Sequence, residues 1–459
     1  MVMLLVPKQS IVAVSMCYVC LSSPSTMAMS LENAISASLT NSTVILAARQ
    51  SWIAQRESIG SETSTSDLTA RLTSTGTLAQ ADIQDGSGFN ESNSFGTFIT
   101  LSKNLYDGGQ TKENVRLGQI NLQMASANYA KTEQTVILTT IESYLDVSRA
   151  RREVKLHDKN LTRLEAHVSA AKIRVEAGAA TPTRMAEARA RYARAKSDAI
   201  LTQTRLKNAE DNFRSLTGTD GSSSLQPAVA HDLPTDMLSA ETIAQSSHPD
   251  ILLAIAAERA ANQAFNTLQA AVRPTVAFSL SANTRIATGT SHDKDEFAAQ
   301  VVLSAPLLST NATSSKARNV AANYEAAKLN RTEAIRKIRV AAREKFRNWE
   351  TTSARLEAVL SEIEAFRLVA KGIASEAQFG QRTLLDLLDA ENDVNDAELS
   401  LVKAEHDQIL SAFRLKAAIG NLTAEHMGLG NVLAPLLDLP NTKNPFQNTF
   451  PFRRIKTND

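Results

Sequence analysis

Residues 380–391 read GQRTLLDLLDAE, and this stretch predicts a sharp turn between two helices. Gly380 can adopt the left-handed backbone conformation that ends one helix, and Thr383 can cap the next. Asp386 then occupies the third helical position, where a carboxylate suits the helix dipole. Capping accounts for Asp386 and leaves Asp389 without a role, so the remainder of the chain must show whether these acids do more than end a helix.

Long helical segments lie on both sides of such turns. Residues 307–434 contain no proline, and residues 110–177 contain no proline and one glycine, Gly118. Both segments are rich in alanine, with apolar residues three and four apart, as in coiled-coil packing. An unbroken helix of ~65 residues is about 100 Å long, far longer than the helices of globular domains.

The chain contains its own pattern twice, at a constant offset of 202 residues. The matching pairs are Gly178 and Gly380, Thr181 and Thr383, Ala188 and Ala390, Ala195 and Ala397, and Gly218 and Gly420. We therefore expect an internal tandem duplication in which each half forms a helical hairpin. Within each half, the threonine and the two alanines of this list are seven positions apart. Small residues at this spacing let neighbouring helices approach closely.

Each half also contains two segments with the period-two alternation of β-strands. They are residues 276–286 and 297–307 in the second half, and residues 68–78 and 95–105 in the first, with a glycine-rich loop at 86–88. Each is ~10 residues or slightly more, the length of a tilted transmembrane strand. A soluble hairpin shows the same alternation, but four such strands in a secreted chain favour a membrane.

Residues 1–28 predict a secretory signal peptide, with an apolar run at 11–21 and small residues ending in Ala28. The run is too short for an ordinary transmembrane helix, and a buried N-terminal helix is the alternative interpretation. Cys17 and Cys20 are the two cysteines of the chain. The mature protein would therefore contain no disulfide and no reactive thiol.

The composition excludes several classes of protein. The 49 basic residues are balanced by 48 acidic ones and interspersed with them, which argues against nucleic-acid binding. The 5% aromatic content argues against a set of compact cores. No spacing of histidine with cysteine or acid suggests a metal site, and no catalytic triad or phosphate loop is visible. We expect no enzyme, no catalytic residue and no cofactor.

These observations predict a mixed α and β membrane protein divided into five parts. The parts are a signal peptide (1–28), a first repeat (29–218), a linker (219–238), a second repeat (239–420) and an irregular periplasmic tail (421–459). Four strands cannot close a barrel, because the smallest barrels have about eight. Three copies would supply twelve strands, enough to enclose a lumen.

Several stretches resemble the TolC family, the trimeric outer-membrane factors of Gram-negative bacteria. They are ITLSKNLYDGG, VVLSAPLLS, GAATPTRMAEARARY, GQRTLLDLLDAE and the closing SLTG and AAIG. The likeness covers the chain from about Leu31 to Gly420. It implies a homotrimer with a twelve-stranded β-barrel in outer-membrane lipid and a coiled-coil α-helical barrel in the periplasm.

The resemblance also implies partners and cargo. A periplasmic adaptor would join the channel to an inner-membrane pump of the RND or ABC type. The cargo would be drugs, detergents or bile salts in multidrug efflux, or proteins in type I secretion. The alternative is that the chain is itself a periplasmic coiled-coil adaptor, which should lack the duplication and the membrane-length strands.

The resemblance further implies roles for the helix tips. Acids matching Asp386 and Asp389 line the constricted periplasmic entrance, and Arg382 matches a basic position that holds neighbouring helices together. The first tip departs from the family, because Arg184 stands where an acid is frequent, and Glu187 takes the position equivalent to Asp389. We expect Arg184 to face acids of a neighbouring tip. The expected tip turns are Gly178, Thr181, Thr183, Gly380 and Thr383. Helix capping stays an alternative role for Asp386.

Overall fold

The computed structural model describes residues 29–64, 67–83, 88–219, 224–289, 293–306 and 311–429. The predicted signal peptide and most of the predicted tail lie outside these residues. The first half contains α1 (Leu31–Asn41), α2 (Thr43–Ser64), β1 (Thr69–Ile83), β2 (Gly88–Tyr106), α3 (Gln110–Glu176) and α4 (Pro182–Thr217). The second contains α5 (Met237–Ser247), α6 (Pro249–Ala271), β3 (Thr275–Gly289), β4 (Lys294–Ser304), α7 (Asn311–Gln378) and α8 (Leu384–Ala418). The two halves thus have the same order of element types.

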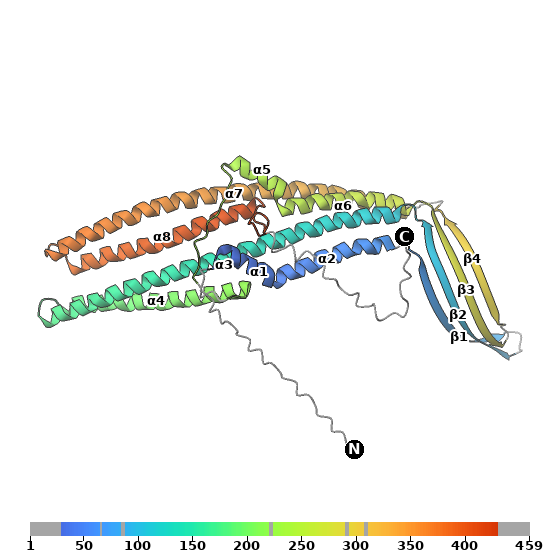
Figure 1. The fold of residues 1–459 in the computed structure, drawn as a ribbon, viewed down its shortest axis with the longest axis horizontal. Coiled ribbons are helices and arrows are strands. Elements are labelled where there is room, and N and C mark those ends of the chain that lie inside the picture. Colours follow the sequence, from blue (N-terminus) through green and yellow to red (C-terminus); the bar gives the residue numbers. More distant parts are fainter. Residues whose placement is uncertain are drawn as a thin grey trace, which may run out of the picture.

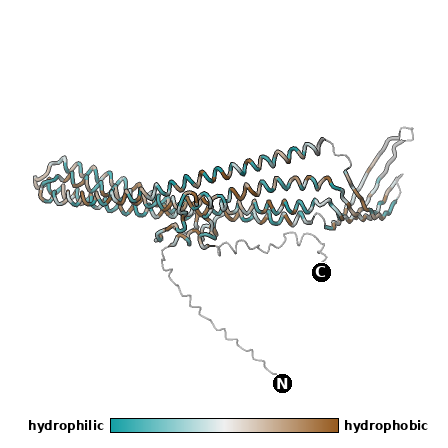
Figure 2. The backbone as a smooth tube through the Cα atoms, turned by 90° about the horizontal axis from the view of Figure 1, so that it is seen from above, coloured by the Kyte–Doolittle hydropathy of each residue, from teal (hydrophilic) through white to brown (hydrophobic). Residues whose placement is uncertain are grey.

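The molecule is elongated, with the β-sheet at one end and two helical turns at the other (Figure 1). The helices α3 and α7 have 67 and 68 residues, so each is about 100 Å long, as predicted. Hydrophilic and hydrophobic residues alternate at short intervals along the helical hairpins (Figure 2). No helix in the described part of the chain is both long and apolar enough to cross a bilayer.

The two long helices form the frame on which the shorter helices pack (Figure 1). Toward the tips, α8 lies between α7 and α3, and α4 packs on α3. Toward the sheet, α6 takes the place of α8 and α2 takes the place of α4. Gly420 lies where α8 gives way to α6; its φ is +82°, and a Cβ there would be 2.7 Å from the Cα of His248. Glycine is therefore required at this joint by both conformation and space.

The largest buried side chains gather near these joints. Tyr144 and Phe213 are fully buried with ring centroids 6.2 Å apart, and the Tyr144 hydroxyl donates to the backbone oxygen of Gln226 at 2.7 Å. Burial raises the pKa of Tyr144 to about 12. Phe346, which matches Tyr144 at the repeat offset, anchors a second cluster with Leu415. The two largest apolar clusters thus hold the middle of the molecule together.

Small residues fill the contacts between helices farther toward the tips. Four alanines predicted from the seven-residue spacing are buried: Ala188, Ala195, Ala390 and Ala397. Their short side chains let the helix backbones come close together, which confirms the expected close approach.

The sheet is antiparallel in the order β1-β2-β3-β4. Its register collects alternate residues of all four strands on one face. One such row is Leu72, Ile99, Ala282 and Phe297. Leu72 and Phe297 are 67% and 72% exposed, so this apolar face is open. The period-two alternation predicted from the sequence is confirmed.

The predicted lengths of the first two strands were wrong. β1 and β2 have 15 and 19 residues, and Gly88, expected in a loop, begins β2. The residues between 79 and 94 are largely polar, so the apolar alternation stops before the strands do. Backbone pairing continues there because the hydrogen-bond ladder does not depend on an apolar face. β4 ends at Ser304, and Leu307, predicted to end the return strand, lies outside the described residues.

Candidate functional site

The two helix tips share one backbone turn. Gly178 and Gly380 have φ values of +70° and +75°. Each glycine follows the last turn of its helix. The N–H of Ala179 donates to the carbonyl of Arg174 at 2.8 Å, and the N–H of Gln381 donates to the carbonyl of Glu376 at 2.9 Å. These are Schellman-type helix ends. A Cβ on either glycine would meet nothing within 4 Å, so the left-handed conformation alone selects glycine.

The second tip closes with a reciprocal hydrogen-bonded cap. The Thr383 Oγ1 accepts the N–H of Asp386 at 3.2 Å, and the Asp386 Oδ2 accepts the N–H of Thr383 at 2.8 Å. The hydrogen bonds from Thr383 hold the pKa of Asp386 below its usual range, and the charge of Arg382 adds to this effect. The capping interpretation of Asp386 is thus confirmed. Its place at an entrance stays a prediction.

Arg382 connects the turn to the end of α7. Its Nε lies 2.8 Å from Glu376 Oε2, and this contact raises the pKa of the guanidinium. The contact lies within one hairpin. The predicted role of Arg382, which is to hold neighbouring helices together across different hairpins, stays a prediction.

The first tip has the same backbone and different side chains. Thr181 is the N-cap of α4, but its side chain makes no capping hydrogen bond, and Pro182 follows at the first helical position. Arg184 occupies the third position, and the first turn contains no acid. Thr183 and Arg184 are both exposed. The expected contact of Arg184 with acids of a neighbouring tip stays a prediction.

Asp389 is held by an arginine that sequence reasoning missed. Its Oδ1 lies 2.8 Å from Nη1 of Arg191 on α4, and Nη2 of the same guanidinium lies 3.6 Å from Glu187 Oε1. Glu187 and Asp389, predicted as equivalent positions of the two tips, therefore meet around one cation. The available signal was the spacing of four residues between Glu187 and Arg191 on one helix face.

A second cross-hairpin contact lies behind the first. The carboxylate of Glu391 on α8 contacts two residues of α3: its Oε2 is 2.9 Å from His167 Nε2 and 3.3 Å from Arg163 Nε. Leu164, Ala195 and Leu388 form a small buried cluster beside it. Asp389 and Glu391 of α8 thus contact basic groups of the first hairpin, which ties the two hairpins together near the tips.

The helix tips present charged groups rather than a catalytic or metal-binding site. In the described part of the chain, no group of three histidine, cysteine or acidic side chains is placed to hold a metal ion. The tip carboxylates are paired with arginines, hydrogen-bonded in a cap or exposed to solvent. Such a site can attract ions, repel them or join helices.

This molecule combines a sheet that has an exposed apolar face with long helical hairpins that end in charged tips. This combination is typical of outer-membrane channel proteins that have a helical domain. The chain belongs to the outer membrane efflux protein family, whose sequence profile matches residues 34–219 and 242–421. The resemblance to the TolC family is therefore confirmed. The class is that of an efflux channel of the outer membrane and not of an enzyme, and the family decides against the adaptor alternative.

Two relatives illustrate this membership. Outer membrane efflux protein BepC of Brucella suis is 29% identical over 333 residues, which cover 72% of this chain and 73% of BepC. Outer membrane protein TolC of Vibrio cholerae is 24% identical over 357 residues, which cover 73% of this chain and 78% of that protein.

Solved structures have the same fold. A membrane protein from Pseudomonas aeruginosa matches with a TM-score of 0.73 at 16% identity, covering 85% of this chain and 90% of its own. The CmeC outer membrane channel of Campylobacter jejuni matches with a TM-score of 0.72 at 14% identity, covering 85% of each chain.

Proposed function

We propose that three copies of this chain assemble into a closed duct that carries efflux substrates across the outer membrane. The observation that carries the proposal is the four-stranded sheet, whose outer strands β1 and β4 each have a neighbour on one side only among the described residues. Its apolar face is exposed. Unpaired edges and an open apolar face both require a partner. Twelve strands from three copies would remove every edge and place the apolar face against lipid.

The helices support the same assembly. In the half of the molecule that holds the tips, α7 and α4 lie at the two outer sides of the row α7, α8, α3, α4. Three such rows joined edge to edge would enclose an α-helical barrel that extends from the β-barrel into the periplasm. The repeated element order and the two separate family matches support an internal duplication, with residues 29–218 and 239–420 as its repeats and 219–238 as the linker.

BepC is named as an outer membrane efflux protein and TolC as an outer membrane protein. We place this chain in a tripartite system, in which its tips meet a periplasmic adaptor and an inner-membrane pump of the RND or ABC type. Drugs, detergents or bile salts, or a protein of a type I secretion system, would pass through it. Residues 1–28 would serve as the export signal and be removed.

The tips would form the periplasmic entrance. Asp386 and Asp389 from three copies would place six carboxylates around a narrow aqueous opening, and a ring of like charges attracts cations. Arg382, Arg184 and Glu187 would belong to the same ring. Its charge would set which ions enter.

The test is the oligomeric state combined with conductance. The purified protein should be a trimer by light scattering in detergent and should form discrete, long-lived channels in planar bilayers. A monodisperse monomer with full β-structure would overturn the assembly. A trimer that never conducts, and whose gene can be deleted without change in tolerance to bile salts or dyes or in protein export, would overturn the duct.

A further inference from the structure

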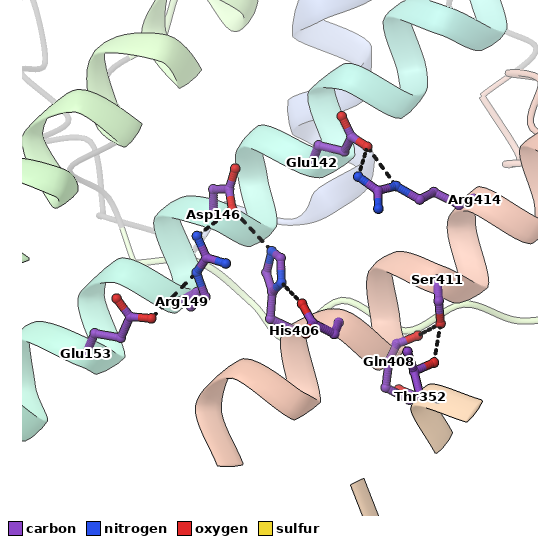
Figure 3. Close-up of polar contacts among 10 residues, drawn as sticks. Glu142, Asp146, Arg149, Glu153, Thr352, His406, Gln408, Ser411 and Arg414 are labelled. Carbon is purple, nitrogen blue, oxygen red and sulfur yellow. Dashed lines mark hydrogen bonds and ion pairs between the residues drawn. The ribbon is translucent and has the colours of Figure 1, made fainter. Parts of the chain in front are cut away.

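Two histidine–carboxylate pairs join α3 to α8, and both lie on the boundary between the two helical hairpins. His406 of α8 faces Asp146 of α3 (Figure 3). Nearer the tips the roles are exchanged, because His167 of α3 faces Glu391 of α8. We call this boundary the α3–α8 seam. Histidine is the side chain whose charge ordinarily changes between pH 5 and 8, so the strength of the seam depends on protons.

The ring of His406 lies between two carboxylates. The side chain is 7% exposed, with Nε2 3.2 Å from Asp146 Oδ1 and Nδ1 3.1 Å from Asp407 Oδ1. A neutral imidazole has one N–H, whereas ionised carboxylates only accept hydrogen bonds. With acids at both nitrogens, a neutral ring must turn one lone pair toward a carboxylate. Nε2 is buried and makes no hydrogen bond, so its 3.2 Å contact with Asp146 is attractive as an ion pair only when the ring is an imidazolium.

Other charges surround this pair from several elements (Figure 3). Arg149 of α3 lies 3.2 Å from Asp146 and 3.6 Å from Glu153, so it shares its charge between two acids. Arg152 of α3 pairs with Glu405 of α8.

Farther out, Arg414 of α8 pairs with Glu142 of α3 at 2.7 Å. Lys345 of α7 lines the same cavity as Asp407. The contact with His406 holds the pKa of Asp146 below its usual range, against the opposing effect of burial. Asp146 therefore stays charged over the range in which histidine titrates.

His167 has a simpler environment. Its Nε2 faces the single carboxylate of Glu391, which Arg163 also contacts, and Arg191 and Arg194 of α4 line the cavity around Glu391. Asp198 of α4, Asp396 of α8 and His157 of α3 line the same cavity, and only one acid contacts the ring of His167. The contribution of His167 should therefore be smaller than that of His406.

We propose that the α3–α8 seam is a proton-sensitive latch between the two helical hairpins. At acidic pH the charged rings of His406 and His167 bind carboxylates of the opposite helix and hold the hairpins together. As the pH rises and the rings lose their protons, these contacts weaken and the hairpins separate more readily. That such a separation widens a duct entrance rests on the proposed function; the latch itself does not.

The test measures the distance between the hairpins in the full-length protein as a function of pH. Spin labels at Lys172→Cys on α3 and Asp393→Cys on α8 report this distance by double electron–electron resonance. Between pH 5.5 and 8 we expect the population with separated hairpins to rise by about threefold to tenfold. One titrating group changes an equilibrium by at most about tenfold per pH unit.

Two replacements of His406 give opposite expectations. His406→Gln carries no charge at position 406 at any pH. Its distance between the hairpins should therefore equal, at every pH, the distance of the wild type at pH 8. His406→Lys stays charged between two carboxylates, so its hairpins should stay close throughout. His167→Gln should reduce the pH response only in part. His157→Gln is the matched control, because His157 lies on α3 between the two pairs and lines the cavity around Glu391, but has no ion pair among the described residues.

The outcomes are distinct. A wild type whose distance does not change with pH, or a His406→Gln variant with the full wild-type response, would overturn the latch. If the distances respond as expected while the protein forms neither trimers nor channels, the latch stands and the proposed function fails. Circular dichroism of each variant at pH 8 establishes that it is folded before its distances are compared.

Discussion

The two helix tips share the same backbone conformation but have side chains of opposite charge. Both use a left-handed glycine and a threonine N-cap at the repeat offset. At the third helical position the second tip has Asp386, which completes a reciprocal cap, and the first tip has Arg184, which does not. The turn thus depends on glycine and the N-cap, while the third position is free to change. Pro182 compensates at the first tip, because its fixed φ suits the first position of a helix.

The difference extends along the returning helices. Residues 182–196 of α4 contain five basic residues and one acid, whereas residues 384–398 of α8 contain six acids and no basic residue. The first hairpin is therefore positive and the second negative near the tips. Opposite charges draw the two hairpins together, and the contacts of Arg191 and His167 with α8 follow from this.

The largest expected effect is on ion selectivity. Replacing Asp386 and Asp389 together by alanine removes two carboxylates per chain from the proposed entrance. In planar bilayers the preference for cations should fall several-fold, and block by multivalent cations should weaken. The single variant Glu376→Gln is the control, because Glu376 is an acid of the same tip paired with Arg382. Unchanged selectivity in the double variant would place these acids away from the conducting path.

Arg184→Glu should convert the first tip into a copy of the second. Thr181 followed three residues later by glutamate is a capping-box sequence, and the new cap should stabilise the start of α4 by about 1 kcal/mol. Hydrogen exchange of the amides of residues 182–185 should slow accordingly. If Arg184 faces acids of a neighbouring tip, the open fraction of the channel should also rise.

Arg184→Ala separates these two effects. It removes the positive charge without supplying a cap, so the channel should open more often while exchange at the tip stays as in the wild type. If neither variant changes conductance, Arg184 has no part in closing the entrance. If Arg184→Glu does not slow exchange, the side chain at the third helical position is not what distinguishes the two turns.

The features predicted correctly from the sequence are local ones. Gly380 and Thr383 define a turn through their own conformational preferences, and strand alternation reads directly from residues two apart. The contacts missed were Arg191 with Asp389, His167 with Glu391, and His406 with Asp146. Each joins residues about 200 or more positions apart, and the register of α8 against α3 and α4 decides which side chains meet. That register follows from tertiary packing of alanine-rich faces, on which no single residue fixes the alignment.

The cap at the second tip should be sensitive to acid. The pKa of Asp386 is lowered in the folded protein, so its contribution to stability is fully present above the ordinary aspartate range, near pH 4, and is lost as the pH falls through the lowered value. Hydrogen exchange at residues 384–387 should therefore accelerate below about pH 4 relative to residues 182–185, after correction for intrinsic exchange. In Asp386→Asn this difference between the tips should disappear. An equal acid response of both tips in the wild type would contradict a stabilising cap at Asp386.

The smallest expected effect concerns the ion pair between the hairpins. Arg191 and Asp389 are 31% and 56% exposed, and solvent screens such pairs to about 0–1 kcal/mol. Asp389→Arg should separate the tips slightly, because it places two arginines together. Exchanging the two residues, as Arg191→Asp with Asp389→Arg, should restore the wild-type distance between spin labels on α4 and α8. Raising the salt concentration should reduce the difference between the single variant and the wild type, since screening weakens exposed pairs. If the exchanged pair behaves like the single variant, the opposite charges of the two hairpins do not act through this contact, and the packing around Leu388 holds the tips together without it.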